Sequence, residues 1–424
     1  MKTMNLRLSR RSFLRTTAAA AAFSIVPRRL LGGPGYTSPS NELTRAIIGC
    51  GGISRTHLPM SDGRLLALCD VDAEHLAERM KGLPADVKGY RDFREILARP
   101  DIDIIHIATP PHWHALMTIM AAEAGKDIWC EKPMARTIGE IIRARDIVQR
   151  RQRIFRINTW FRYSRTFYEF GTPVAPLKKI VSNGLLGWPI KVIVGAATGF
   201  NWKLEMWSGK TDLTAEPIPA CLDYNLWLGP APYKPYHPHR VHSSFRGYWD
   251  YDAGGLSDMG QHYLDPVQYI LGKDDTNPVE VEVDTPPQPA DAVVPWRRVT
   301  LKYADGCTVI LDGDNREKDA PYLEGPLGKV WPQLRSNIPN LARKAEELPD
   351  PPPFNDDFAQ CVRTRRPFVL NEQNAARSCI MVQMAACAVK LGRSLKFDPV
   401  ALRFIGDDEA NRLIDQPMRS PWHL

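Results

Sequence analysis

The sequence predicts an α/β fold that begins with a doubly wound parallel sheet and continues into an α+β domain with a mainly antiparallel, open sheet. Three observations support this. From Arg45 onward, short apolar runs alternate with stretches of helical periodicity. A glycine-rich loop separates the first apolar run from the next helical stretch. The second half instead carries strand-like runs divided by turn signals such as Asp305-Gly306, which is typical of antiparallel sheets.

The first 40 residues are expected to lie outside this fold. They include the adjacent Arg10 and Arg11, followed by an Ala-rich run over residues 16–26. That run is too short to span a bilayer, which takes about 20 residues. This order is typical of a twin-arginine export signal, which a translocase reads on folded proteins. The alternative is a disordered basic arm or nucleic-acid tail, although an Ala-rich run does not suit phosphate binding. We expect a signal and linker over 1–40, export to the periplasm or an equivalent compartment, and no stable membrane insertion.

The charge balance separates this segment from the rest of the chain. Residues 1–40 contain seven Lys and Arg and no acid, and removing them from the 55 basic residues leaves 48, equal to the 48 Asp and Glu. The excess of +7 therefore gives no reason to expect nucleic acid as a partner. The remaining length exceeds that of most single cores, which predicts domains over 41–160 and 161–424. Eight cysteines lack Cys-x-x-Cys spacing, so we expect reduced, buried thiols and no metal.

The glycine loop runs from Gly49 to Ser54 with the sequence Gly-Cys-Gly-Gly-Ile-Ser. It follows the apolar run at 46–48, so a dinucleotide pyrophosphate could sit on the N-terminus of the next helix. Asp70 ends the second run, over 65–68, where a carboxylate accepts hydrogen bonds from ribose hydroxyls and repels a 2′-phosphate. NAD is therefore favoured over NADP. Helix capping is the alternative role, and Asp72 is the expected cap.

Two further segments follow expected strands at 102–108 and 128–130, namely Thr109-Pro110 to His114 and Glu131-Lys132-Pro133. The carboxyl ends of parallel strands form the edge where such sheets bind ligands. The expected cofactor-binding residues are Gly49, Gly51, Gly52, Ile53, Asp70, Thr109, Pro110, His114, Glu131 and Lys132.

The stretch that contains Asp258, His262 and Asp265 is expected to be a helix, with Gly254-Gly255 at its start. Asp258, His262 and Asp265 fall on one face at i, i+4 and i+7, beside an apolar stripe that includes Met259 and Tyr263. A histidine flanked by carboxylates suits abstraction of a hydroxyl proton. The alternative is a capped helix with a satisfied salt bridge.

These motifs together resemble the Gfo/Idh/MocA family of glucose-fructose oxidoreductase, inositol dehydrogenase and rhizopine-catabolism proteins. The resemblance covers residues 43–424, with Ser54 at the third glycine and Pro111 at the family's usual asparagine. The tail at 406–413 and Pro421-Trp422 is similar to the exported branch. The family implies a Rossmann domain that binds NAD and a homo-oligomer.

By this resemblance, Lys132, Asp258 and His262 form the catalytic group. Lys132 would donate a hydrogen bond to the reacting oxygen, His262 would relay the proton, and Asp258 would orient His262. Asp265 would support this group from behind.

Eight aromatic residues lie between Cys221 and Tyr251, interleaved with Arg and His. Such a mixture suits the C–H face and hydroxyls of a sugar, although we expect about half of these rings to be core. The expected substrate residues are Trp160, Arg162, Trp202, Tyr236, Arg240, Arg246, Trp249 and Asp265. A metal cluster of His237, His239 and His242 is disfavoured, because the three lie in a Pro-rich loop without helical spacing.

The second domain is expected to contain strands at 190–196, 279–283, 298–303 and 307–311, followed by helices within 355–391.

Three functions fit these residues. The first is an oxidoreductase acting on a sugar or polyol CH–OH by hydride transfer with tightly bound NAD. The second, known among relatives, is a redox-neutral glycosidase with transient oxidation, elimination and re-reduction. The third is a non-catalytic carbohydrate-binding protein, disfavoured by the presence of Lys132, Asp258 and His262. Export would favour NAD as a resident group, since free NAD is scarce outside the cytoplasm.

Overall fold

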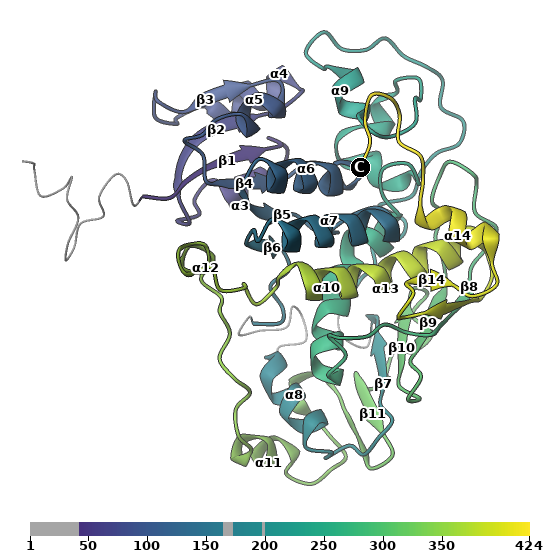
Figure 1. The fold of residues 1–424 in the computed structure, drawn as a ribbon. Helices are drawn as coiled ribbons and strands as arrows, with labels where there is room; N and C mark the ends of the chain where they lie inside the picture. The colour runs from purple at the N-terminus through teal and green to yellow at the C-terminus, as the bar shows by residue number, and fades with distance from the viewer. Residues whose placement is uncertain (1–41, 164–172, 197–199) are drawn as a thin grey trace, which may run out of the picture. The chain divides into compact units, whose positions relative to one another are not determined.

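The computed structural model describes residues 42–163, 173–196 and 200–424 (Figure 1). The expected export segment lies outside the described residues. Leu43–Leu424 form one compact unit. The division of this unit at residue 160 stays a prediction. Among the described helices, none combines the length and apolar character needed to cross a membrane.

The first sheet has six strands, all parallel, in the order β3-β2-β1-β4-β5-β6. Its strands are β1 (Thr44–Ile48), β2 (Arg64–Cys69), β3 (Lys88–Tyr90), β4 (Ile104–Ile107), β5 (Asp127–Cys130) and β6 (Phe155–Ile157). The strand order reverses between β1 and β4, so the carboxyl ends of these two strands open the crevice where ligands bind in such sheets. The predicted doubly wound sheet is confirmed.

Helices α3 (Ser54–His57), α4 (Ala73–Met80), α5 (Phe93–Leu97), α6 (Pro111–Glu123) and α7 (Ile138–Arg150) connect these strands. Side-chain caps fix where several of them begin. The Asp72 carboxylate accepts from the backbone N–H groups of Glu74 and His75, and Thr137 caps α7 in the same way. Helices α6 and α7 lie side by side over the sheet (Figure 1).

The second sheet has eight strands in the order β12-β11-β7-β10-β9-β8-β13-β14. It contains β7 (Lys191–Val194), β8 (Glu280–Asp284), β9 (Arg298–Lys302), β10 (Thr308–Asp312), β11 (Leu323–Gly325), β12 (Gly328–Val330), β13 (Leu395–Asp398) and β14 (Arg403–Phe404). Only β7 and β10 pair in parallel. The mainly antiparallel sheet is confirmed, and the four predicted strands match β7 to β10.

The remaining helices are α8 (Val174–Ser182), α9 (Tyr224–Leu228), α10 (Gly254–Leu271), α11 (Leu341–Glu347), α12 (Phe358–Thr364), α13 (Glu372–Leu391) and α14 (Asp408–Ile414), with 3₁₀ turns η4 (Pro238–Arg240), η5 (His242–Gly247) and η6 (Pro332–Leu334). Helix α13 packs along both α10 and α7. Every residue of α10 except Tyr269 is buried, so the face that carries Asp258 and His262 is enclosed like the apolar stripe beside it.

A second hydrophobic core lies between η5 and α9. It contains Leu222, Tyr224, Trp227, Leu228, Ala231, Tyr236, Val241, Phe245, Tyr248, Tyr251 and Ala292. Seven of the eight aromatics between Cys221 and Tyr251 are buried, and only Tyr233 is exposed. More of these rings are core than expected, because they pack against one another rather than presenting their faces to solvent.

Candidate active site

A groove runs along the carboxyl ends of β1, β2 and β4. Seven of the predicted cofactor residues line it, namely Gly49, Gly51, Gly52, Ile53, Asp70, Thr109 and Pro110. Its opposite wall comes from α9 and η5, through Leu226, Trp227, His242, Ser243, Phe245 and Arg246. The groove is therefore built by segments from both halves of the chain.

The glycine loop has the backbone that a dinucleotide needs. Gly49 adopts a φ of +98°, and a Cβ there would lie 2.5 Å from the carbonyl oxygen of Ala108. A Cβ on Gly51 or Gly52 would meet nothing within 4 Å, so these residues leave free space along the groove. Arg79 donates to the carbonyls of Cys50 and Gly51, which fixes the loop from behind. The residues present fit a bound dinucleotide.

Asp70 stands at the end of β2, facing this loop. Its Oδ2 accepts from the Cys50 N–H at 2.6 Å and its Oδ1 from the Asp72 N–H at 2.8 Å. Burial raises the pKa of Asp70, against the two backbone hydrogen bonds that favour the ionised form. Asp70 thus shapes the loop and also lines the groove, where its role toward a ribose stays a prediction.

His114 does not line the groove. It is buried, with Nδ1 2.6 Å from the Pro133 carbonyl oxygen and Nε2 2.7 Å from the Thr109 carbonyl oxygen. The imidazole therefore bridges the two segments that follow β4 and β5. The expected cofactor contact is replaced by a positioning role for Thr109 and Pro133.

Glu131 is buried beneath the site in a chain of four ionisable groups, Asp62, His106, His57 and Glu131. Asp62 Oδ2 lies 2.7 Å from His106 Nε2, His106 Nδ1 lies 2.9 Å from His57 Nδ1, and His57 Nε2 lies 2.8 Å from Glu131 Oε1. Burial favours a neutral Glu131, but hydrogen bonds from His57 and Asn158 and the charge of Lys132 lower its pKa. Glu131 is expected among the cofactor ligands, yet its Oε1 is held by His57 and Asn158.

The hydrogen bonds in this series of four side chains determine which ring nitrogens of the two histidines carry a proton. Burial lowers the pKa of His106 to about 4, so its ring is neutral and donates from Nε2 to Asp62. His57 must then donate from Nδ1 to His106, and from Nε2 to the Glu131 carboxylate. His57 therefore donates from both ring nitrogens and lies buried between the His106 ring and the Glu131 carboxylate.

Lys132 and Asp258 form the centre of the candidate active site. The Lys132 ammonium donates to the Asp258 backbone carbonyl at 2.6 Å and to Asp258 Oδ1 at 2.9 Å. Asp258 also accepts from Arg246 Nε at 2.7 Å and from Trp207 Nε1 at 3.0 Å. Burial opposes ionisation of Asp258, but Lys132 and Arg246 outweigh it and hold its pKa well below the usual range.

The structure does not place Asp258 against His262. The carboxylate is occupied by Lys132, Arg246 and Trp207, so it orients the lysine instead. Within the described residues, His262 Nδ1 has no hydrogen-bond partner, and the ring packs edge-on to Trp160 at 4.9 Å between centroids. Burial, and then the Lys132 charge, lower the pKa of His262 to about 3, so the imidazole is neutral at neutral pH.

Most of the predicted substrate residues lie elsewhere. The six that are buried among other protein groups are Arg162, Trp202, Tyr236, Arg240, Trp249 and Asp265. Arg162 is held by Asp265 and Asp274, which fill its guanidinium donors. Arg240 pairs with Asp291. Asp265 therefore belongs to an ion pair separate from that of Asp258. Trp160, which is 39% exposed, and Arg246 remain at the site.

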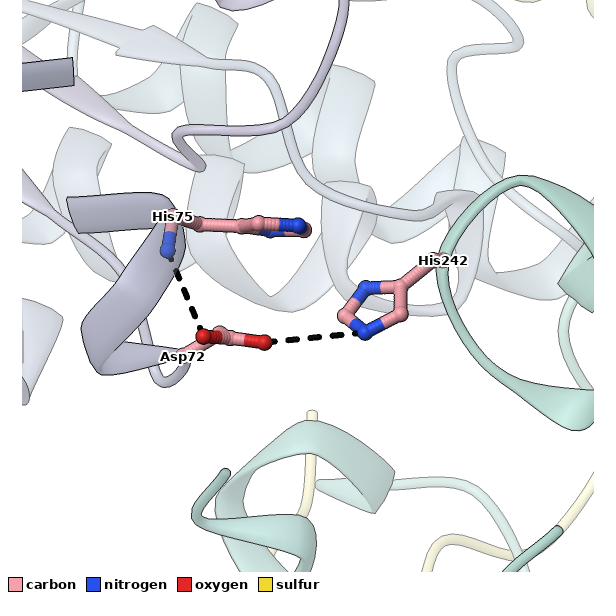
Figure 2. Close-up of side chains that lie close together, drawn as sticks. All are labelled: Asp72, His75 and His242. Carbon is pink, nitrogen blue, oxygen red and sulfur yellow. Dashed lines mark hydrogen bonds and ion pairs between the residues drawn. The ribbon is translucent and has the colours of Figure 1, made fainter. Parts of the chain in front are cut away.

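Sequence reasoning missed the groove residues His75, Trp113 and Ser243. It also considered His242 only together with His237 and His239. In the structure, His239 Nδ1 lies 2.7 Å from the Tyr248 hydroxyl and His237 pairs with Glu216, whereas His242 lies beside Asp72 and His75 (Figure 2). No periodicity joins residue 242 to 72 and 75, so the sequence carried no signal for this grouping.

Two family models match the chain. One, described as the NAD-binding Rossmann fold of the Gfo/Idh/MocA oxidoreductase family, covers residues 43–159. The other, described as the C-terminal alpha/beta domain of that oxidoreductase family, covers residues 170–424.

Curated relatives match over part of the chain. Levoglucosan dehydrogenase of Pseudarthrobacter phenanthrenivorans is 31% identical over 182 residues, 43% of this chain and 36% of the relative. A glycosyl hydrolase family 109 protein of Shewanella pealeana is 30% identical over 175 residues, 35% of this chain and 38% of the relative. Inositol 2-dehydrogenase of Gluconacetobacter diazotrophicus is 27% identical over 191 residues, 43% of this chain and 53% of the relative. The chain thus spans only about a third to a half of their length.

Among solved structures, the WlbA dehydrogenase from Bordetella pertussis, in complex with NADH and UDP-GlcNAcA, has a TM-score of 0.58 at 16% identity. The match covers 84% of this chain and 98% of that one. At this identity the likeness concerns the fold.

Proposed function

Because the chain belongs to the Gfo/Idh/MocA oxidoreductase family, we propose that it oxidises or reduces a CH–OH group of a sugar or polyol, with NAD held in the groove. The single observation that carries this proposal is the cluster of Lys132 and Asp258 next to a neutral His262, joined to the groove wall through Arg246. The printed names of the levoglucosan and inositol dehydrogenases support the substrate class.

Lys132 is the group that binds the reacting oxygen. An ammonium has three donors, and Asp258 takes two of them, through its backbone carbonyl and Oδ1. The third donor remains for the substrate oxygen, whose partial negative charge it stabilises as the proton leaves. Asp258 fixes the direction of that donor, and Arg246 and Trp207 fix Asp258.

His262 is the proposed proton acceptor. A neutral imidazole with an unpaired, buried nitrogen can take the hydroxyl proton without first losing one. Trp160 packs edge-on to this ring. NAD, when bound, supplies the hydride acceptor for the same carbon.

A redox-neutral glycosidase is the second candidate, and it is favoured by the relatives named glycosyl hydrolase family 109 proteins. The same residues serve both reactions, since each begins by removing a hydroxyl proton from the sugar. The two differ in whether NAD changes its redox state over a complete turnover. A non-catalytic carbohydrate-binding protein is disfavoured by the retained cluster.

We also propose roles for the segment at 1–40, in export, and for the second half of the chain, in assembly. A twin-arginine signal there would carry the folded protein to the periplasm with NAD already bound. NAD would then act as a resident group, and the translocase would be a transient partner. A homo-oligomer, formed through the open sheet of the second half, completes the proposal.

The test starts with protein purified without added cofactor, precipitated with acid, and assayed for released NAD. A preparation without dinucleotide contradicts the resident-cofactor proposal. The protein is then given sugars, polyols and chromogenic glycosides while NADH absorbance and leaving-group release are followed together. A lasting NADH signal supports the oxidoreductase, and leaving-group release at constant absorbance supports the glycosidase.

Two variants connect this result to the site. Lys132→Met and His262→Ala should each lower kcat by at least about 100-fold while NAD stays bound. His423→Ala, an exposed histidine outside the groove, serves as the matched control. Full activity in the double variant Lys132→Met/His262→Ala contradicts the assignment of these residues.

A further inference from the structure

We propose that Asp72, His75 and His242 form a binding site for a divalent transition-metal ion such as Zn²⁺ at the rim of the groove. One ligand atom from each of the three lies within 4.8 Å of the others. Figure 2 shows the two imidazoles gathered around the Asp72 carboxylate. Two imidazole nitrogens and one carboxylate oxygen are a donor set that suits Zn²⁺, with a fourth position left for water or another oxygen.

The spacing of these groups fits a shared ion better than a direct hydrogen bond. Asp72 Oδ2 lies 3.5 Å from His242 Nε2. A charge-assisted hydrogen bond between such groups is usually about 2.7–2.9 Å long. Two ligands of a tetrahedral zinc with bonds of about 2.0–2.1 Å lie roughly 3.3 Å apart. The rings of His75 and His242 are 4.5 Å apart between centroids, and a ligand atom of each lies within 4.8 Å of the Asp72 carboxylate oxygen.

Each ligand is held in position by the backbone around it. Asp72 Oδ1 caps α4, and Oδ2 of this side chain, which is only 7% exposed, faces His242. The segment that leads into α4 is tied to residues 221–223, because Ala73 donates to the Cys221 carbonyl and Asp223 donates to the Val71 carbonyl. The Asp72 carboxylate is thus pre-positioned before an ion arrives.

His242 is the ligand that comes from the other half of the chain. It adopts a φ of +52°, a left-handed conformation that non-glycine residues rarely take. This conformation directs its ring toward α4, across the groove that all three residues line. A bound ion would therefore link α4 to η5, beside the loop that holds Asp70.

The experiment uses the full chain without a polyhistidine tag, in chelator-free buffer, titrated calorimetrically with ZnCl₂. We expect one site per chain, with affinity at least about 100-fold weaker in His75→Ala and in His242→Ala. Asp72→Asn should also weaken binding, while asparagine keeps the helix cap. His239→Ala is the matched control, because it removes a histidine of the same loop that lies outside the cluster, and its affinity should be unchanged.

Three outcomes would overturn the proposal. These are no saturable binding, equal binding in His242→Ala and the parent protein, or loss of the site in His239→Ala. A Co²⁺ titration gives a second readout, since the visible absorption of a tetrahedral site should disappear in His75→Ala. NAD content is measured on the same preparations, so failure of the proposed function is distinguished from failure of the metal site. Metal binding itself does not rest on that function.

Discussion

The buried pair of His57 and Glu131 should be strongly coupled in the free energy of unfolding. His57 Nε2 lies 2.8 Å from Glu131 Oε1, and the two side chains are 0% and 6% exposed, so solvent does not screen them. At an effective dielectric of about 20, their attraction is about 6 kcal/mol before desolvation is subtracted. Removing one partner of such a pair usually costs about 3–5 kcal/mol, whereas replacing both by apolar residues is often nearly neutral.

The assay is a double-mutant cycle of His57→Leu and Glu131→Leu, followed by equilibrium unfolding in guanidinium chloride at neutral pH. Each single variant should lose about 3 kcal/mol or more, and the double variant should lose much less than their sum. The exposed pair Arg343 and Glu347 is the control, with an expected coupling below about 0.5 kcal/mol. If the losses at His57 and Glu131 simply add, the energetic coupling of this buried pair is refuted.

The sign of the pH dependence follows from the same pair. The folded state lowers the pKa of Glu131, so the stability it contributes is present above the unfolded pKa of about 4.3. That contribution is lost as pH falls through the folded value. Glu131→Leu should therefore flatten the acid limb of the stability profile.

Three further predictions concern the glycine loop, the buried Asp252 and the proposed base His262. Gly49→Ala should destabilise the protein by about 3 kcal/mol or more in chemical unfolding, because its Cβ would lie only 2.5 Å from the Ala108 carbonyl oxygen. The control is Gly82→Ala, where φ is also positive but the space is open, and it should lose only about 1–2 kcal/mol. Equal losses in the two variants would contradict this reasoning. Burial raises the pKa of Asp252 to about 7, so the stability associated with its protonated form is lost as pH rises from about 4 to about 7. The free energy of unfolding of Asp252→Asn should then exceed that of the parent protein by up to about 4 kcal/mol at pH 8 and equal it near pH 4. A difference that does not change with pH would show that Asp252 does not titrate in this range. The pKa of His262 is lowered to about 3, so His262 should not cause any change of kcat with pH near pH 6.5. If kcat does change with pH near 6.5 and this change disappears in His262→Ala, the assignment of a neutral His262 is contradicted.

The local sequence pattern predicted the helices and strands whose conformation depends mainly on nearby residues. Continuous apolar runs located the central strands of the parallel sheet, and β7 to β10 fell within a few residues of their predicted bounds. The strands β11 to β14 were missed, because runs of two to four residues carry no period of their own. They become strands only because β7 and β8 offer unpaired edges.

Site residues were predicted correctly where their position follows from spacing along the sequence. They were missed where their role depends on a partner far away in the chain. The positions of Gly49 and Asp70 follow from one strand-loop-helix unit. The partner of Asp258 does not follow from local spacing. Helical periodicity places His262 nearby, but the Asp258 carboxylate forms its ion pair with Lys132, which is far away in sequence. For the same reason Arg162 looked available for substrate until Asp265 and Asp274 were seen to hold it.

The two walls of the groove also set an order of events during folding. The backbone of Asp72 bridges to Leu222, and Arg91 donates to the carbonyls of Val71 and Cys221, so the groove closes only after a long stretch of chain has been synthesised and docked. Contacts of such high sequence separation form late, since the loop between them must first be ordered. A dinucleotide held between both walls would therefore mark a chain that has finished folding.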